Sequence, residues 1–264
     1  MSRTRPRLPR AGIVGILAGG LLAGLVVAAP PAGAGATNPV LDPVARRMVS
    51  GWMPYWTPDS SLASFEAHAE LFGDVTGFWH SATGASSIDD QLSDTKRAEI
   101  VDAVHAKGVR ILGAVTDGTA PRAMAAILTN KTSRSAHVKA LVALATANDY
   151  DGIDLDYEKF AFSDGSSTWG TTRPAWVAFV KELSAALHAK RLWLTVAVPV
   201  MYDSDRDASS GYWVYDYAGI GPYVDRLRIM TYDYSVSSPG PIAPIAWVRR
   251  VLDYATTQVS PGKI

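Results

Sequence analysis

The sequence reads Asp-Tyr-Asp-Gly-Ile-Asp-Leu-Asp-Tyr-Glu from Asp149 to Glu158, with one apolar or aromatic residue between successive members of the last three carboxylates. Side chains of a β-strand alternate between two faces with a period of two, whereas those of a helix spread around its axis. In a strand, Asp154, Asp156 and Glu158 therefore point to one face. The residues that point to the opposite face are Ile153, Leu155 and Tyr157.

Three like charges on one strand face are costly to bury. The carboxylates repel one another and burial raises their pKa values, so we expect at least one to keep a proton at neutral pH. A buried carboxylate without a partner also destabilises a protein core. Catalysis is the function that such a costly arrangement favours.

Two simpler interpretations compete with a catalytic one. In a calcium loop, Asp149, Asp151 and Asp154 would supply oxygen ligands, but Gly152 comes too early and no acidic residue stands at the closing position. In a solvated edge strand the residues between the acids would be polar, and here they are apolar or aromatic. Both interpretations are disfavoured.

The N-terminus has the features of an export signal. Four arginines precede an uncharged stretch, 11–29, which is followed by small-residue cleavage sites between 32 and 36. We expect a signal peptide (1–36), a leader (37–47) and one catalytic domain (48–264). The expected location is therefore secreted, extracellular or in the cell envelope, and the protein would be held at a membrane only if the signal stays uncleaved.

Composition limits the partners of the chain. Of its 264 residues, 48% are hydrophobic, enough for a sizeable core in a single domain. Four of the 25 basic residues lie in the signal, so the remainder of the chain has 21 basic and 25 acidic residues, which disfavours nucleic acid as a partner. With no cysteine, neither disulfides nor a metal-thiolate site can form, and we expect no metal and no cofactor.

Short apolar runs alternate with amphipathic stretches along the chain. This alternation predicts an α/β fold, a (β/α)8 TIM-type barrel whose chemistry lies at the carboxyl ends of its strands. A doubly wound sheet is the alternative, but it would carry a glycine-rich turn after its first strand, where residues 51–56 are aromatic-rich. The expected strands are 48–55, 75–80, 109–116, 152–157, 192–199 and 226–232, and the expected helices are 60–72, 93–107, 133–147, 174–189, 212–223 and 245–259.

Three segments resemble glycoside hydrolase family 18. Residues 151–158 are similar to the DxxDxDxE strand of that family, residues 230–233 (Met-Thr-Tyr-Asp) to the M-x-Y-D element of its sixth strand, and residues 51–56 to its aromatic first strand. Within the family, segments 215–221 and 238–244 look most like bacterial spore-cortex-lytic N-acetylglucosaminidases. The third strand departs from the chitinase pattern Ser-x-Gly-Gly, because residues 114–118 read Ala-Val-Thr-Asp-Gly.

The resemblance implies a retaining hydrolysis in which the 2-acetamido oxygen of the sugar attacks its own anomeric carbon. Glu158 would act as acid and base, Asp156 would accept the acetamide N–H, and Asp154 would lie deeper and share a proton with Asp156. Tyr232 would donate to the acetamido oxygen and Asp233 would orient the sugar. The implied partner is a polysaccharide that contains N-acetylglucosamine, in peptidoglycan or chitin.

Aromatic residues at strand ends are candidates for stacking against sugar rings. Trp52, Tyr55 and Trp79 are the expected subsite residues, whereas Met230 inside a strand and His80 are interpreted as structural. Core packing is the interpretation for Trp176, Trp193 and Trp247.

Residues 260–264 resemble the start of a seventh strand, so the barrel is expected to be incomplete after about six strand–helix units. An incomplete barrel would expose apolar surface and unpaired strand edges, which predicts low stability and low activity. The sequence lacks the tryptophan that the family places on its eighth strand. A non-catalytic sugar-binding protein is therefore an alternative to an enzyme, and the presence of Glu158 favours the enzyme.

Overall fold

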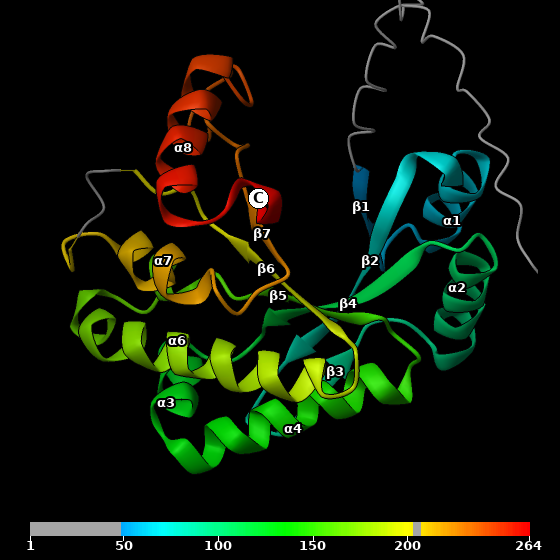
Figure 1. The fold of residues 1–264 in the computed structure, drawn as a ribbon, viewed down its shortest axis with the longest axis horizontal. Coiled ribbons are helices and arrows are strands. Elements are labelled where there is room, and N and C mark those ends of the chain that lie inside the picture. Colours follow the sequence, from blue (N-terminus) through cyan, green and yellow to red (C-terminus); the bar gives the residue numbers. More distant parts are fainter. Residues whose placement is uncertain (1–48, 203–206) are drawn as a thin grey trace, which may run out of the picture. The chain divides into compact units, whose positions relative to one another are not determined.

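Parallel strands alternate with helices throughout the computed structural model, which describes residues 49–202 and 207–264 (Figure 1). The expected signal peptide and leader lie outside the described residues. The strands are β1 (Val49–Pro54), β2 (Phe72–Ala82), β3 (Ile88–Asp90), β4 (Arg110–Asp117), β5 (Gly152–Asp156), β6 (Trp193–Val198) and β7 (Arg226–Ile229). The α-helices are α1 (Pro58–Ala67), α2 (Asp94–Ala106), α3 (Ala123–Thr129), α4 (Lys131–Ala147), α5 (Lys159–Phe162), α6 (Ser166–His188), α7 (Tyr217–Ile220) and α8 (Ile245–Gln258), and 3-10 turns cover Ala69–Leu71, Gly211–Tyr215 and Pro261–Lys263.

The sheet follows the order β1-β2-β4-β5-β6-β7, and each neighbouring pair on this path is parallel. Short β3 pairs antiparallel with β2 at its carboxyl end. The sheet is strongly curved, because Arg228 of β7 donates to Thr76 of β2 although three strands separate them in the sheet. A curved parallel sheet with helices outside is the architecture of a (β/α) barrel, which confirms the expected fold class.

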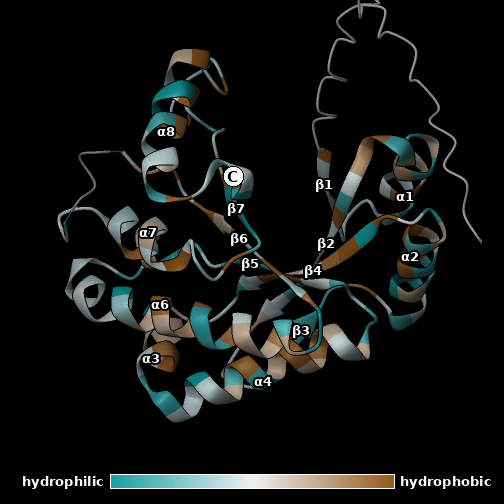
Figure 2. Cartoon of the chain, in the orientation of Figure 1, coloured by the Kyte–Doolittle hydropathy of each residue, from teal (hydrophilic) through white to brown (hydrophobic). Residues whose placement is uncertain are grey.

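The strand register separates an inner face of the curved sheet from a face that packs against helices. Residues that share a face across paired strands include Trp52, Thr76 and Leu112 on the inner side. Val75 and Ile111 face the helices and belong to the main hydrophobic core. Hydrophobic and hydrophilic residues alternate along the helices in Figure 2, as expected for helices with one face on a sheet.

Local sequence fixes several helix starts. Ser93 caps α2 by accepting from the backbone N–H of Lys96, and Asn130 caps α4 by accepting from two backbone N–H groups. Helix α6 begins at Ser166, earlier than the expected start at Pro174, because tertiary contacts offset the hydrogen bond that proline removes. One such contact is the 2.7 Å bond from Trp169 Nε1 to the carbonyl of Phe160.

Some elements differ from those expected. The expected helix 212–223 is a 3-10 turn followed by α7, because Asp216 between them has a left-handed backbone (φ 38°). The sequence pattern did not predict β3, α3 and α5, which are short. Residues 260–264 form a 3-10 turn instead of the start of a strand, so that expectation is wrong, and Lys263 there donates to the carbonyl of Gly221. Within the described ranges, every helix is too short or too polar to span a bilayer.

Candidate active site

The three alternating carboxylates lie at the carboxyl end of β5. Asp154 and Asp156 belong to the strand, and Glu158 follows it at the start of α5. The residues between the carboxylates are fully buried in the helix-facing core, as the alternation predicts. We call Asp154, Asp156 and Glu158 the carboxylate row.

Asp154 is the deepest member of the row and is fully buried. Its Oδ2 accepts from Arg228 Nη1 at 2.8 Å and from Trp52 Nε1 at 3.2 Å, and its Oδ1 accepts from the hydroxyl of Thr195. Burial raises the pKa of Asp154, while the charge of Arg228 and the Thr195 hydrogen bond oppose that rise. Residues from three other strands thus contact this one carboxyl group.

Asp156 and Glu158 share a hydrogen bond at the surface end of the row. Burial, the charge of Glu158 and the charge of Asp154 raise the pKa of Asp156 to about 7. Burial raises the pKa of Glu158 too, and its hydrogen bond with Asp156 opposes that rise. Asp154 contacts Arg228, Trp52 and Thr195. These contacts do not fix the position of a proton, so the expected sharing of a proton between Asp154 and Asp156 stays a prediction.

Oδ1 of Asp156 is buried and accepts no hydrogen bond within the described residues. A buried acceptor without a donor is costly, and such an atom in a native protein calls for an explanation. Because Asp156 also lines a pocket, an N–H group of a bound molecule could supply the donor.

The backbone between Asp156 and Glu158 is fixed through Tyr157. The carbonyl oxygen of Tyr157 accepts a 2.7 Å hydrogen bond from the hydroxyl of Tyr215. The hydroxyl of Tyr157 lies 2.6 Å from Nε2 of His137. All three side chains are fully buried. Burial lowers the pKa of His137 to about 4, so the ring is neutral near pH 7.

Two pockets of the described chain meet at Glu158. The first, which we call the β1-side pocket, has a volume of about 420 Å³ and contains Asp156. The second, the α8-side pocket, has a volume of about 540 Å³ and is rich in aromatic side chains. Glu158, Met230 and Tyr232 line both pockets. The remaining aromatic lining is Trp52, Trp56 and Phe78 in the β1-side pocket and Phe162, Tyr202, Tyr212, Tyr234 and Trp247 in the α8-side pocket.

Tyr232 and Asp233 follow β7 and reach the same region as the row. Burial and the charges of Asp156 and Glu158 raise the pKa of Tyr232 to about 12, so its hydroxyl keeps its proton. Asp233 lines the α8-side pocket and has a left-handed backbone (φ 57°), a strained conformation for a residue with a Cβ. The structure therefore brings all five of the residues to which the resemblance gives a catalytic or orienting role into one region.

Two of the expected subsite aromatics lie elsewhere. Trp79 is 1% exposed and belongs to the helix-facing core, where its ring covers Gly77, so the expectation that it contacts a sugar is wrong. Tyr55 packs edge-on against Trp56, and Trp56 rather than Tyr55 lines the β1-side pocket. Trp52 does line that pocket.

Strand parity contains the signal that the sequence interpretation missed. The inner face of β2 carries Asp74, Thr76 and Phe78. The alternation of faces therefore predicts that Phe78, and not Trp79, lines the pocket, as it does. Trp247 and Met230 were interpreted as core residues, yet they line pockets. Trp176 is fully buried, which confirms its core assignment, and His80 is buried with its Nε2 2.8 Å from the hydroxyl of Tyr150.

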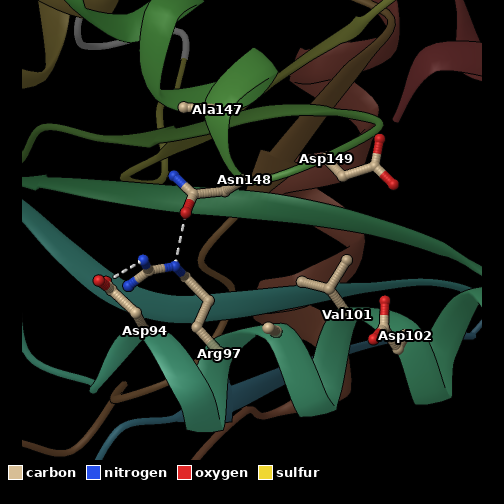
Figure 3. A pocket seen from close by; sticks show the side chains of 8 residues that line it. Asp94, Arg97, Val101, Asp102, Ala147, Asn148 and Asp149 are labelled. Atoms are coloured by element: carbon tan, nitrogen blue, oxygen red, sulfur yellow. Dashed lines mark hydrogen bonds and ion pairs between the residues drawn. The ribbon is translucent and has the colours of Figure 1, made fainter.

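Another pocket lies between α2 and the end of α4 and shares no lining residue with the two beside Glu158 (Figure 3). Arg97 dominates it and donates to Asn148 Oδ1 at 2.6 Å and to Asp94 Oδ1 at 2.5 Å. The guanidinium thus already has hydrogen-bond partners within the pocket.

Comparison with known proteins identifies the family. The family model of "Glycosyl hydrolases family 18" matches residues 52–264. The chain belongs to glycoside hydrolase family 18. The matched residues include the carboxylate row and both pockets.

Several family 18 relatives are curated bacterial proteins. The glycosylase YdhD of Bacillus subtilis, which its name links to sporulation, is 29% identical over 233 residues, covering 86% of this chain and 48% of that protein. The cortical fragment-lytic enzyme of Bacillus anthracis is 32% identical over 125 residues, covering 46% of this chain and 27% of that protein. The chain thus spans about half the length of YdhD and less of the other relative.

Solved structures agree on the fold. A class V chitinase from Pseudomonas fluorescens is similar with a TM-score of 0.71 and 25% identity, covering 82% of this chain and 66% of that one. The spore cortex-lytic enzyme SleL of Bacillus megaterium has a TM-score of 0.67 and 20% identity, covering 82% of this chain and 49% of that one. At that identity, the likeness to SleL shows the fold alone.

Proposed function

We propose that this family 18 protein hydrolyses β-1,4 linkages next to N-acetylglucosamine in peptidoglycan or chitin-type glycans, with retention of configuration. The observation that supports this most is the position of Glu158 at the wall common to the two pockets. A sugar in the β1-side pocket and its neighbour in the α8-side pocket would place the bond between them at Glu158.

The proposed first step uses the acetamido group of the sugar as nucleophile. Its carbonyl oxygen attacks the anomeric carbon, the bond to the leaving oxygen breaks, and Glu158 gives its proton to that oxygen. Asp156 accepts the acetamide N–H at Oδ1, the atom that lacks a donor, and its negative charge stabilises the positive intermediate. The hydroxyl of Tyr232 donates a hydrogen bond to the acetamido oxygen and keeps its proton.

The second step returns the enzyme to its starting state. Glu158, now ionised, takes a proton from a water molecule, whose oxygen attacks the anomeric carbon as the ring of the intermediate opens. Two inversions give net retention. The first step needs one proton shared by Asp156 and Glu158, so activity should decrease as pH rises through about 7, the pKa of Asp156.

The proposal includes the location and the class of substrate. Export by the N-terminal signal would bring the enzyme to wall or environmental glycans outside the cytoplasm. A relative named as a cortical fragment-lytic enzyme and a similar structure named as a chitinase support a glycan of N-acetylated sugars. The aromatic lining of both pockets suits the apolar faces of pyranose rings.

Incubation with purified peptidoglycan and with chitin oligosaccharides tests the function. We expect new reducing ends that carry N-acetylglucosamine, identified by mass, and initial products in the β configuration, identified by NMR. Binding without any cleavage would support the alternative, a sugar-binding protein. Initial products in the α configuration would contradict the acetamido mechanism.

A further inference from the structure

Arg228 crosses the inside of the curved sheet. It belongs to β7, its side chain is 9% exposed, and its guanidinium carbon lies 4.9 Å from the centre of the Trp52 ring on β1. Nη1 donates to Thr76 Oγ1 at 2.7 Å and to Asp154 Oδ2 at 2.8 Å, and Nη2 donates to Asp74. One cation thus faces two fully buried carboxyl groups.

The hydrogen bonds determine where a proton can reside on Asp154. Oδ2 accepts from Arg228 and Trp52, and neither N–H donor can accept a hydrogen bond in return. Among the residues that the structure describes, Oδ1 has the hydroxyl of Thr195 as its one partner. A proton on Oδ2 would break both of its contacts, and a proton on Oδ1 would remove the negative charge that the guanidinium faces at 2.8 Å, so Arg228 favours the ionised form of Asp154.

We propose that Arg228 is a positioning residue of the carboxylate row: anchored on Asp74 and Thr76, it keeps Asp154 ionised, so that the proton of the row lies between Asp156 and Glu158. This inference rests on the proposed function for its catalytic consequence. The distribution of the proton is a property of the folded protein and can be measured without turnover.

Burial and the guanidinium act in opposite directions on Asp154. Burial raises the pKa of Asp154, and Arg228 is the first cause that opposes it. Without Arg228, burial and the negative charge of Asp74 would favour the protonated form. Asp154 would then take the proton at a depth where the sugar cannot use it.

Groups from several strands around Arg228 and Asp154 affect the equilibrium between the protonated and ionised forms of Asp154. Asp74 and Thr76 face the guanidinium from β2, Trp52 from β1, and Thr195 faces Asp154 from β6. The charges that act on Asp156 are those of Glu158 and Asp154. Arg228 is the cation among them that contacts the row.

The first test follows the carboxyl carbons of ¹³C-labelled aspartate by NMR across pH 4 to 9 in the full chain. We expect the Asp154 resonance of the parent to remain in the carboxylate position near neutral pH. In Arg228→Gln it should move to the carboxylic-acid position at pH 7. An Asp154 resonance that is protonated at pH 7 in the parent, or unchanged in Arg228→Gln, would overturn the proposal.

A second test does not require removal of Arg228. Asparagine has the shape of a protonated aspartate, so Asp154→Asn removes a charge only if Asp154 is ionised. We expect Asp154→Asn to lower the apparent pKa of Asp156 by about one unit, because a like charge two residues away is lost. In the Arg228→Gln background the same change should have little effect. An equal response in both backgrounds would contradict the proposal.

Two further variants separate charge from packing. Arg226→Gln removes a guanidinium from the same strand that lies over Trp193, and we expect no change in the Asp154 resonance. Arg228→Lys keeps a cation and should keep Asp154 ionised, whereas a protonated Asp154 in this variant would argue against an electrostatic role.

If glycans are not cleaved while the titrations behave as expected, the proposed function fails and the role of Arg228 stands. If glycans are cleaved but Arg228→Gln leaves Asp154 ionised, the role of Arg228 fails alone.

Discussion

The hydroxyl of Tyr215 donates a 2.7 Å hydrogen bond to the carbonyl oxygen of Tyr157, the residue between Asp156 and Glu158. The side chain of Tyr157 faces the helices, on the opposite side of the strand from the carboxylate row. The bond from Tyr215 therefore holds the peptide group between Tyr157 and Glu158 from the helix-facing side. Burial and the charge of Glu158 raise the pKa of Tyr215 well above its ordinary value, so the hydroxyl remains a donor. The position of the acid thus depends on a residue outside both pockets.

Tyr215→Phe should therefore reduce both stability and turnover. Loss of the bond leaves a buried carbonyl without a donor, at a cost of about 1 to 3 kcal/mol in the free energy of unfolding. We expect kcat to decrease roughly tenfold as the Glu158 peptide loses its anchor. Tyr150→Phe, which removes another buried tyrosine hydroxyl, is the control. It should lower stability without lowering kcat, and an equal loss of kcat in both variants would contradict the positioning role.

The raised pKa of Asp156 predicts a pH dependence of stability. The pKa of Asp156 is about 7 in the folded protein and 3.8 in the unfolded chain, so the folded state binds this proton more tightly than the unfolded state. Stability from this group is fully present below about pH 4 and is lost as pH rises through 7, with a total of roughly 4 kcal/mol at most. Urea unfolding of the parent and of Asp156→Asn from pH 4.5 to 7.5 measures it. The parent should lose stability relative to the variant as pH rises, and parallel curves would show that Asp156 is ionised throughout.

Two aromatic residues, Trp56 in the loop after β1 and Trp79 in β2, should differ in role: Trp56 should contribute to substrate binding and Trp79 to stability. Trp56→Ala removes a wall of the β1-side pocket and should raise KM by about tenfold, in line with roughly 1 to 3 kcal/mol for a ring stacked on a ligand, with little loss of stability. Trp79→Ala creates a cavity in the core and should cost about 3 to 5 kcal/mol in unfolding free energy. Thermal unfolding and glycan hydrolysis of both variants provide the comparison. A stable Trp79→Ala protein with weakened substrate binding would show that Trp79 contacts sugar.

Tyr232 should act through its hydroxyl and not through a change of charge. Tyr232→Phe should lower kcat by roughly ten- to a hundredfold, since one hydrogen bond to the reacting acetamido oxygen is lost. Because the pKa of Tyr232 is raised to about 12, the remaining activity should keep the pH profile of the parent between pH 5 and 9. A profile measured for both proteins on chitin oligosaccharides checks this. A changed basic limb would mean that the hydroxyl itself titrates during turnover.

The alternation of carboxylates is sufficient to predict the strand and the face of each of its residues, and the alternation of apolar runs with amphipathic stretches predicts the barrel. Period-two patterning acts over a few residues, and burial of Ile153, Leu155 and Tyr157 fixes the register. The same parity, applied to β2, would have excluded Trp79 in favour of Phe78. An aromatic residue near the end of a strand contacts a ligand only if it lies on the inner face, and Trp79 lies on the face that packs against the helices.

Contacts across the sheet could not be predicted in this way. Arg228 shares a face with Met230 in the sequence pattern, but its bonds to Asp74 and Asp154 depend on how strongly the sheet curves. Our proposal for the position of the proton depends on those contacts, and the expectation of a proton shared by Asp154 and Asp156 stays a prediction that the NMR titration of Asp154 tests. The curvature of the sheet is set by the packing of many helices, so it cannot be predicted from the sequence pattern of one short segment.

Replacement of Glu158 tests the central claim most directly. Glu158→Gln keeps the shape of the side chain but cannot donate its proton to the leaving oxygen, and Glu182→Gln, an exposed partner of Arg134, serves as the matched control. We predict that hydrolysis of peptidoglycan or chitin oligosaccharides decreases by roughly 10² to 10⁴ in Glu158→Gln while glycan binding is retained, and that the control behaves as the parent. Parent-like hydrolysis by a folded Glu158→Gln protein would contradict the account.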